Sequence, residues 1–108
     1  MNLPVGSTTK LRLGIVVRQS DSYRGKRISD VLFQLFKKND FGGATVLLAR
    51  EGYDDRGFVT STALGLSAKL PLVIKTVELR ERVLSLLERM KEVVGPHGLI
   101  TISEVDVI

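Results

Sequence analysis

Three carboxylates, Glu51, Asp54 and Asp55, stand close together in the segment EGYDDRG. Carboxylate oxygens at such short spacing are ligands that a hard cation such as Ca²⁺ prefers. The segment lacks the alternating D-x-D-x-D-G pattern and the closing glutamate of a calcium loop. The chain also has no cysteine and a single histidine, His97, so thiolate sites are excluded and an imidazole ligand would act with carboxylates alone. We therefore expect a solvated acidic loop and no metal site.

The sequence gives equally little support for catalysis by a nucleophile and a base. Serine and threonine are plentiful, but His97 is the only imidazole base and no catalytic motif surrounds it. This histidine falls in a predicted turn between a helix and a strand, where a structural role is far more common. We expect no catalytic residues and no enzyme activity.

Cations gather before the first predicted helix, where YRGKR contains Arg24, Lys26 and Arg27. The free N–H groups and the dipole of a helix N-terminus favour an anion at such a position. Arg50 and Arg56 flank EGYDD, and an oligomer that brings this segment to a neighbour's helix start would make these groups converge on a nucleotide-sized anion. The sequence has no GxxxxGK[ST] or GxGxxG signature of phosphate binding. Arg50 and Arg56 are therefore equally well interpreted as ordinary surface arginines.

The aromatic residues argue against recognition of RNA on a sheet surface, which needs exposed aromatic side chains on the central strands. No predicted strand contains any of the aromatic residues, which are Tyr23, Phe33, Phe36, Phe41, Tyr53 and Phe58. The net charge of +4 is dispersed along the chain and forms no dense basic stripe. We expect no nucleic-acid partner.

The hydrophobic pattern predicts the elements that must position these residues. A period-two alternation indicates a strand over 10–18, and helical spacing indicates an amphipathic helix over 26–38. Phe41-Gly42-Gly43 would end this helix with a glycine in the left-handed conformation. The continuous apolar run 44–49 is typical of a strand buried on both faces. The remaining predicted elements are a strand over 70–77, a helix over 79–94 and a strand over 99–108.

The order of these elements predicts an α+β, ferredoxin-like βαββαβ sandwich with a four-stranded antiparallel sheet and both helices on one face. The runs ATVLLA and LPLVI are apolar at odd and even positions, so the other face would need another subunit to cover it. In the last strand, Val105 and Val107 have the opposite parity to Ile100 and Ile102. This change predicts a bulge near Ser103 and Glu104, or a strand end that leaves its sheet.

Length and composition agree with one small domain. The chain has 108 residues, of which 44% are hydrophobic, so its core is modest and oligomerisation would supplement its stability. We expect a short tail over 1–9 and a single domain over 10–108. No apolar run is long enough to span a bilayer, and the first residues lack the apolar stretch of a secretory signal. We expect a cytoplasmic protein without direct membrane insertion.

Several segments together resemble the uncharacterised PII-like proteins called domain of unknown function 190, in the GlnB/CutA-like superfamily. These segments are YRGK before the first helix, FGGATVLLAREGY around the second strand, and TSTALGLSAKLPLVI leading into the third. The resemblance covers the chain from about Lys10 to Ile108. It implies a PII-like homotrimer whose sheets line the centre, in agreement with the uncovered face. It also implies that 51–70 corresponds to the mobile T-loop of PII signalling proteins.

The resemblance further implies a signalling role. In the relatives, adenine nucleotides bind in clefts between subunits at the base of the T-loop, and the loop reports occupancy to a partner such as a membrane transporter or an enzyme. No other cofactor is implied. The matching positions and the flanking arginines give the candidate ligand-binding residues Tyr23, Gly25, Lys26, Arg50, Glu51, Gly52, Tyr53 and Arg56. The candidate partner-facing residues are Asp54, Asp55, Phe58, Thr60 and Ser61.

The chain also departs from the family pattern. Arg27 stands where a proline is common, and Val59, Thr62 and Gly65 stand where the family carries a histidine and arginines. These departures leave open whether the ligand is a nucleotide, a different molecule or none. Two alternatives therefore remain, a ligand-free structural or protein-interaction module and, less favoured, a CutA-like metal-handling protein.

Overall fold

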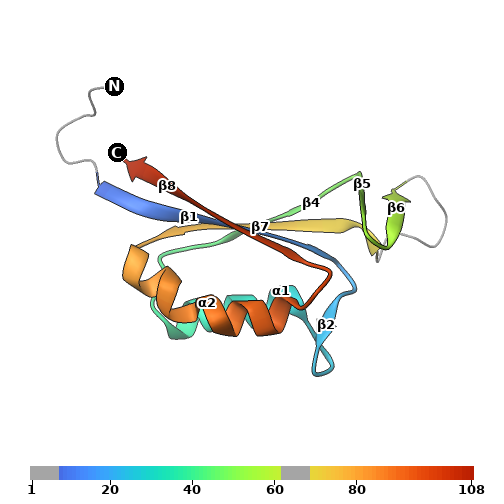
Figure 1. Cartoon of the computed structure of the whole chain (residues 1–108), viewed down its shortest axis with the longest axis horizontal. Helices are drawn as coiled ribbons and strands as arrows, with labels where there is room; N and C mark the ends of the chain where they lie inside the picture. Colours follow the sequence, from blue (N-terminus) through green and yellow to red (C-terminus); the bar gives the residue numbers. More distant parts are fainter. Residues whose placement is uncertain (1–7, 62–68) are drawn as a thin grey trace.

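The computed structural model describes residues 8–61 and 69–108, in which helices α1 and α2 pack on one face of a four-stranded sheet (Figure 1). The strands lie in the order β4-β7-β1-β8, and every neighbouring pair is antiparallel. This is the predicted α+β, ferredoxin-like βαββαβ arrangement. The elements are β1 (Thr8–Arg18), α1 (Ile28–Lys38), β4 (Thr45–Leu48), β7 (Pro71–Glu78), α2 (Arg80–Val94) and β8 (Leu99–Val107).

The hydrophobic core lies between the sheet and the two helices. Every second residue of β1 points to the helices, and Leu13 and Ile15 are fully buried there. Ile15 pairs with Ile74 of β7, so the apolar side chains of the two central strands form one surface. The helices complete the core with Leu32, Phe36, Val83, Met90 and Val93.

The end of α1 differs from the prediction. Asp40, and not a glycine, adopts the left-handed conformation, with a φ of 61°. Phe41 then turns back and stacks on Phe36, with ring centroids 4.8 Å apart. The backbone N–H of Gly42 donates to Oε2 of Glu78 at 2.9 Å. The segment after α1 is therefore held by ring stacking and by a buried carboxylate.

The strand β4 is not buried on both faces as predicted. It is an edge strand that pairs only with β7, and its Leu47 and Leu48 are 50% and 53% exposed. An edge strand lacks a neighbour on one side, so apolar side chains of either parity remain accessible in the single chain.

The predicted bulge in the last strand is also wrong. The strand β8 stays paired with β1 over its whole length, and no residue interrupts the register. Ile100 and Ile102 therefore face the helices, while Val105 and Val107 lie on the opposite face of the sheet. The change of parity reflects two apolar faces and needs no distortion of the backbone.

The face of the sheet opposite the helices is uncovered (Figure 1). Exposed apolar side chains lie on it from all strands of the sheet, namely Val16, Leu47, Val77, Leu99 and Val107. The expectation that helices cover only one face is confirmed, and the homotrimer that would cover the other face stays a prediction. Neither helix in the described residues is long and apolar enough to cross a membrane.

A short hairpin stands directly before α1, where the sequence indicated only a turn. Its strands are β2 (Ser22–Tyr23) and β3 (Lys26–Arg27). Arg24 and Gly25 connect them, with φ values of 50° and 81°. Two connecting residues with positive φ form a tight hairpin turn. Strands of two residues are too short to produce a detectable alternation, which explains why the sequence did not reveal them.

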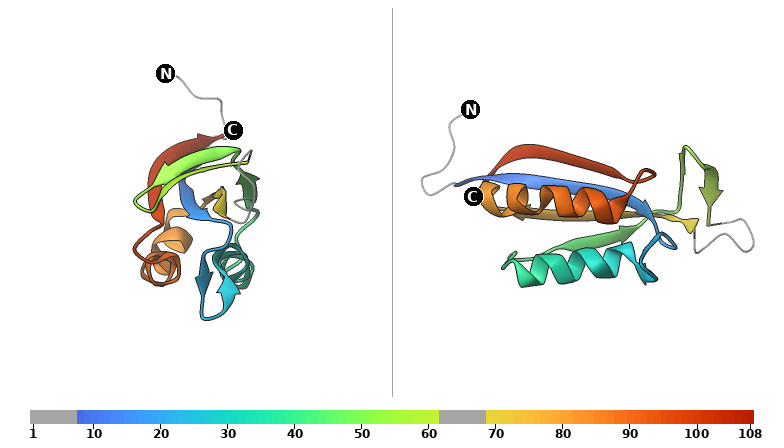
Figure 2. Two further views of the ribbon diagram at one scale, coloured as in Figure 1. Left: turned by 90° about the vertical axis from the view of Figure 1, so that its right-hand side faces the viewer. Right: turned by 60° about the horizontal axis from the view of Figure 1, so that its bottom comes forward.

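A second hairpin projects beyond β4 and β7 (Figure 1, Figure 2). Its antiparallel strands, β5 (Glu51–Asp54) and β6 (Gly57–Thr60), occupy the first half of the segment 51–70, which the sequence presented as one loop. Thr62 and Gly65, two of the departures from the family pattern, lie outside the described residues.

The hairpins place three aromatic residues in strands, where the sequence predicted none. Tyr23 lies in β2, and Tyr53 and Phe58 pair across β5 and β6. The central strands β1 and β7 contain no aromatic residue. The four-stranded sheet therefore lacks the aromatic side chains on which RNA bases would stack, as the sequence predicted.

Candidate ligand site at the base of the β5–β6 hairpin

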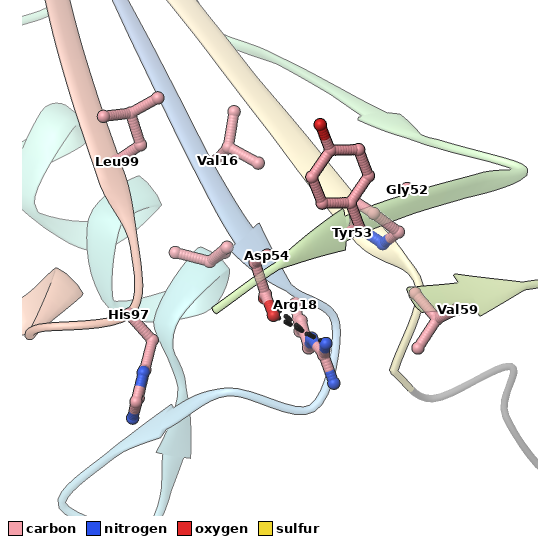
Figure 3. Close-up of a pocket in the computed structure, with 10 residues that line it drawn as sticks. Val16, Arg18, Gly52, Tyr53, Asp54, Val59, His97 and Leu99 are labelled. Atoms are coloured by element: carbon pink, nitrogen blue, oxygen red, sulfur yellow. Dashed lines mark hydrogen bonds and ion pairs between the residues drawn. The ribbon is translucent and has the colours of Figure 1, made fainter. Parts of the chain in front are cut away.

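A buried arginine connects the β5–β6 hairpin to the end of β1 (Figure 3). Arg18 donates from Nε to Oδ2 of Asp54 at 2.8 Å and from Nη2 to Oδ1 at 2.7 Å. Its Nη2 also donates to the carbonyl oxygen of Gly57 at 2.9 Å. Arg18 is only 8% exposed, so water cannot easily replace these acceptors. The geometry is the bidentate pairing in which arginine holds a carboxylate most firmly.

A second arginine extends this pair into a network of alternating charges. Arg56 donates to both carboxylate oxygens of Asp21, at 2.6 and 3.0 Å, and to Oδ2 of Asp54 at 3.1 Å. Asp21 also accepts the backbone N–H of Arg18 at 2.8 Å. The turn after β1 and the tip of the hairpin are thus fixed to one another.

The network keeps its carboxylates ionised. Partial burial alone would raise the pKa of Asp54, but the hydrogen bonds from Arg18 and Arg56 outweigh it and lower this pKa to about 2. The pKa of Asp21 is also lowered, because hydrogen bonds from Arg56 and from the backbone of Arg18 outweigh the effect of burial. At neutral pH both carboxylates of the network are therefore charged.

A hollow of about 280 Å³ lies beside this network, between the hairpin base and the uncovered face of the sheet (Figure 3). Val16 and Leu99 form part of its apolar lining, and both also belong to the uncovered face. Tyr53 is 86% exposed at its edge. The other lining residues are Val17, Arg18, Gly52, Asp54, Val59, Pro71 and His97.

The single histidine contributes a further contact between the hairpin and the body of the protein. His97 lies in the turn between α2 and β8, as predicted, and its Nδ1 is 2.8 Å from Oδ2 of Asp55. Because Asp54 faces Arg18 and Asp55 faces His97, the neighbouring carboxylates point to different partners. Within residues 8–61 and 69–108 there is no cluster of side chains able to hold a metal ion.

The structure separates the candidate ligand-binding residues into groups. Gly52 and Tyr53 line the hollow. Arg56 belongs to the charge network. Arg50 and Glu51 do not line the hollow but directly precede Gly52 in the chain, and the carbonyl oxygen of Arg50 accepts the N–H of Ser61 at 2.7 Å.

The remaining candidates, Tyr23, Gly25 and Lys26, belong to the β2–β3 hairpin. Tyr23 and Lys26 line a different hollow, together with α1 and α2, and the two hollows share no lining residue. One chain therefore does not bring the two groups of candidates together. Their convergence across a subunit boundary stays a prediction.

The candidate partner-facing residues also have different surroundings. Asp54 and Asp55 turn toward Arg18 and His97. Phe58 is 60% exposed and therefore accessible to a partner. The last two candidates, Thr60 and Ser61, lie at the end of β6, where Thr60 is half-buried and Ser61 is exposed.

Two of the departures from the family pattern have structural explanations. Val59 is 3% exposed and forms part of the apolar wall of the hollow, where a polar side chain would be buried. Arg27 has a φ of −59° at the N-cap of α1, close to the value that proline imposes. The replacement of a proline by Arg27 therefore keeps the same backbone conformation available.

Several residues of the site were not predicted from the sequence. Arg18, Asp21 and His97 all contact the hairpin, and Val16 and Leu99 line the hollow. Arg18 is the last residue of the strand predicted over 10–18, and no local pattern links it to Asp54, which follows 36 residues later. The one available signal was the position of Arg18 at the end of a strand, next to turn residues.

Comparisons with known proteins identify the family and support the fold. The model of the family DUF190, described as Uncharacterized ACR, matches residues 10–107. The UPF0166 protein MJ1524 of Methanocaldococcus jannaschii is 30% identical over 92 residues, which are 85% of each chain. The UPF0166 protein of Aquifex aeolicus is 33% identical over 101 residues, which are 92% of this chain and 93% of the relative.

Solved structures of PII-like proteins have a similar fold at low sequence identity. CPII from Thiomonas intermedia K12, a nitrogen regulatory PII-like protein bound to ADP, AMP and bicarbonate, superposes with a TM-score of 0.73 at 16% identity, covering 96% of this chain and 92% of CPII. TTHA0516 from Thermus thermophilus, for which a PII-like signaling role has been suggested, gives a TM-score of 0.68 at 19% identity, covering 94% of this chain and 92% of that protein. The chain therefore belongs to the DUF190 family and has the fold of PII-like proteins.

Proposed function

We propose that the protein is a PII-like signalling protein that binds a small anionic metabolite, an adenine nucleotide, between subunits at the base of the β5–β6 hairpin. One observation carries the proposal: the hollow at the hairpin base continues into the uncovered face of the sheet. Val16 and Leu99 belong to both surfaces. A second subunit that covers the face would therefore also close the hollow.

The size of the hollow supports a site shared between subunits. Its volume of about 280 Å³ is at the lower limit of the roughly 300–1,000 Å³ that is typical of small-molecule sites. A nucleotide would therefore need a wall from another chain. CPII, which shares the fold, has been solved with ADP and AMP, and this precedent favours a nucleotide over other anions of similar size.

The lining offers groups suited to each part of a nucleotide. The exposed ring of Tyr53 is available to stack on a base, and Val16 and Leu99 provide apolar contact. Arg18 and Arg56 are already neutralised by aspartates, so they are poor partners for a phosphate. Phosphates would instead use Arg50 or cations that a neighbouring subunit contributes.

The charge network suggests how occupancy would reach a partner. A nucleotide bound in the hollow would lie beside the Arg18–Asp54 pair, which holds the hairpin to the end of β1, so occupancy would change the orientation of the hairpin. The position of Phe58, which is exposed on the hairpin, would then change. A regulated partner, which would be a membrane transporter or an enzyme, would therefore meet a different surface.

The proposal is tested by isothermal titration calorimetry with ATP, ADP and AMP on the unmodified protein and two variants. Tyr53→Ala should weaken binding about tenfold, because stacking of a base on an aromatic ring contributes roughly 1–3 kcal/mol. Phe58→Ala is the matched control, an exposed aromatic on the paired strand that does not line the hollow, and it should bind as the unmodified protein does. Absence of heat at millimolar nucleotide, together with an unchanged melting temperature, would refute the proposal.

The second candidate is a ligand-free module that docks a protein through the hairpin. It is favoured by the complete pairing of Arg18 and Arg56 with aspartates, which already holds the hairpin without a ligand. In that case Phe58→Ala would abolish capture of the partner, and nucleotides would leave capture unchanged.

A further inference from the structure

The β2–β3 hairpin stands on the helix side of the molecule (Figure 2). A second hollow, of about 480 Å³, is lined there by residues of this hairpin, of α1 and of α2. We call it the hairpin–helix groove. It is lined by Tyr23, Arg24, Lys26, Val31, Gln34, Leu35, Lys38 and Arg89. Within one chain the groove shares no lining residue with the hollow at the hairpin base.

The lining from α1 forms one continuous stripe. Val31, Gln34, Leu35 and Lys38 follow the three- and four-residue spacing that places side chains on the same face of a helix. Val31 and Leu35 are half-buried and pack against the core, so they are fixed in position and present an apolar surface. The groove thus has an apolar floor along the helix.

One wall of the groove is formed by Tyr23, which has several side-chain contacts. Its hydroxyl donates to Oε1 of Glu92 at 2.6 Å and accepts from Arg89 at 3.1 Å. The guanidinium groups of Arg24 and Arg89 lie over its ring, 5.2 and 5.5 Å from the centroid. These contacts hold two of the cations of the groove in place before any partner arrives.

The charge of the groove is strongly unbalanced. Four cations line it, and the nearby carboxylate of Glu92 pairs with two of them, Arg89 at 2.9 Å and Arg24 at 3.8 Å. Lys26 and Lys38 form no ion pair with any residue that the structure describes. A partner with carboxylates would therefore find cations that are not yet satisfied.

We propose that the hairpin–helix groove docks an acidic segment of a partner protein, with apolar side chains on the floor and carboxylates against the cations. Charge complementarity to Lys26 and Lys38 and apolar contact with Val31 and Leu35 together fit a peptide that alternates both kinds of side chain. The proposal goes beyond the nucleotide site and does not depend on it.

A nucleic acid or an anionic membrane fits the surroundings less well. The helices that border the groove also expose Asp30, Glu81 and Glu88. These carboxylates would repel a polyanion that extends past the groove, whereas a short acidic segment inside it would avoid them.

The test uses fluorescence anisotropy with a short fluorescein-labelled peptide of glutamate and leucine in helical spacing. We expect saturable binding that weakens as salt is added. Lys38→Glu should weaken binding about five- to tenfold, because an attraction is replaced by a repulsion. Lys37→Glu is the matched control, since it makes the same charge change one residue earlier but lines a different hollow, beside Phe33 and Phe41. It should change the affinity less than about twofold.

Further controls separate groove binding from general charge attraction. A peptide with lysine in place of glutamate should not bind, and one with serine in place of leucine should bind more weakly because it loses contact with Val31 and Leu35. Circular dichroism confirms that both variants fold. Equal weakening by Lys38→Glu and Lys37→Glu, absence of binding at low salt, or efficient displacement of the peptide by single-stranded RNA would overturn the proposal. Nucleotide calorimetry on Lys38→Glu should be unchanged, which keeps this outcome independent of the nucleotide site.

Discussion

Arg18 and Asp54 form a bidentate ion pair that joins the last residue of β1 to the last residue of β5, 36 residues further along the chain. Arg18 is buried, and its Nη2 also donates to the carbonyl oxygen of Gly57. The pair fixes the direction in which the hairpin leaves the sheet. It also defines one side of the hollow at the hairpin base.

Asp54→Asn should lower the free energy of unfolding by about 1–2 kcal/mol, after allowance for the partial exposure of this carboxylate. The substitution removes the charge that compensates buried Arg18 and replaces an accepting oxygen by a donating NH₂ group, which faces another donor. Urea denaturation at fixed protein concentration measures the change.

The neighbouring Asp55→Asn is the control for this prediction. Asp55 is exposed, and its contact with His97 lies at the surface, where a single polar contact contributes little. Its substitution should change the free energy of unfolding by less than about 0.5 kcal/mol. Equal effects of the two substitutions would contradict a special role of the Arg18 pair.

The stability provided by Asp54 should disappear in acid. Its pKa is about 2 in the folded chain against an ordinary value of 3.8, so the folded state binds this proton less readily. A lowered pKa stabilises the folded state fully above about pH 5, and this contribution is lost as the pH falls toward 2. The difference in unfolding free energy between the unmodified protein and Asp54→Asn should therefore shrink from pH 5 to pH 2. A difference that stays constant over this range would show that ionisation of Asp54 is not the cause.

The fold was predictable from the sequence because its long elements have clear periodicity. The alternation in β1 and the helical spacing in α1 and α2 each extend over many residues, so they identify the βαββαβ order. The short hairpins were not predictable, because strands of two and four residues carry too little pattern. The bulge predicted from the parity change in β8 is wrong because the apolar residues of this strand were all assigned to a single face, whereas they lie on both.

Only those residues of the candidate site that lie within one continuous segment of the sequence could be predicted. Gly52 and Tyr53 lie in the segment that the sequence singled out, and they line the hollow. The partners that give this segment its position come from distant elements: Arg18 from β1 and His97 from the turn before β8. Pairings between such distant charges leave no trace in a single sequence, because many arginines and aspartates could satisfy one another equally well.

Substitution on the uncovered sheet face should disrupt the proposed homotrimer. Val77→Asp places a charge on this face in β7, a central strand, where the side chain of Val77 is 38% exposed in the single chain. Burial of that charge in an interface between sheets is costly, so light scattering coupled to gel filtration should show a change from trimer to monomer. Leu84→Asp is the control, because Leu84 is a similarly exposed apolar residue on α2, away from the sheet. A monomer before any substitution would contradict the trimer itself.

Glu78 should be more important for stability than its place at the end of a strand indicates. It is 3% exposed and accepts hydrogen bonds from the backbone N–H groups of Leu79, at 2.8 Å, and Gly42, at 2.9 Å. Arg82 donates to it at 3.0 Å. Burial would raise the pKa of Glu78, but these hydrogen bonds outweigh it and lower the pKa, so the group is charged at neutral pH.

Glu78→Gln should therefore lower the free energy of unfolding by about 1–3 kcal/mol, because an amide cannot accept at both positions and its NH₂ group would face a donor. The start of α2 and the segment after α1 would lose their common anchor, which hydrogen exchange at the amide of Gly42 should report as faster exchange. Glu81→Gln, an exposed acid in the first turn of α2, should cost only a few tenths of a kcal/mol. If Glu78→Gln were as mild as Glu81→Gln, the buried carboxylate would not be the anchor that its hydrogen bonds indicate.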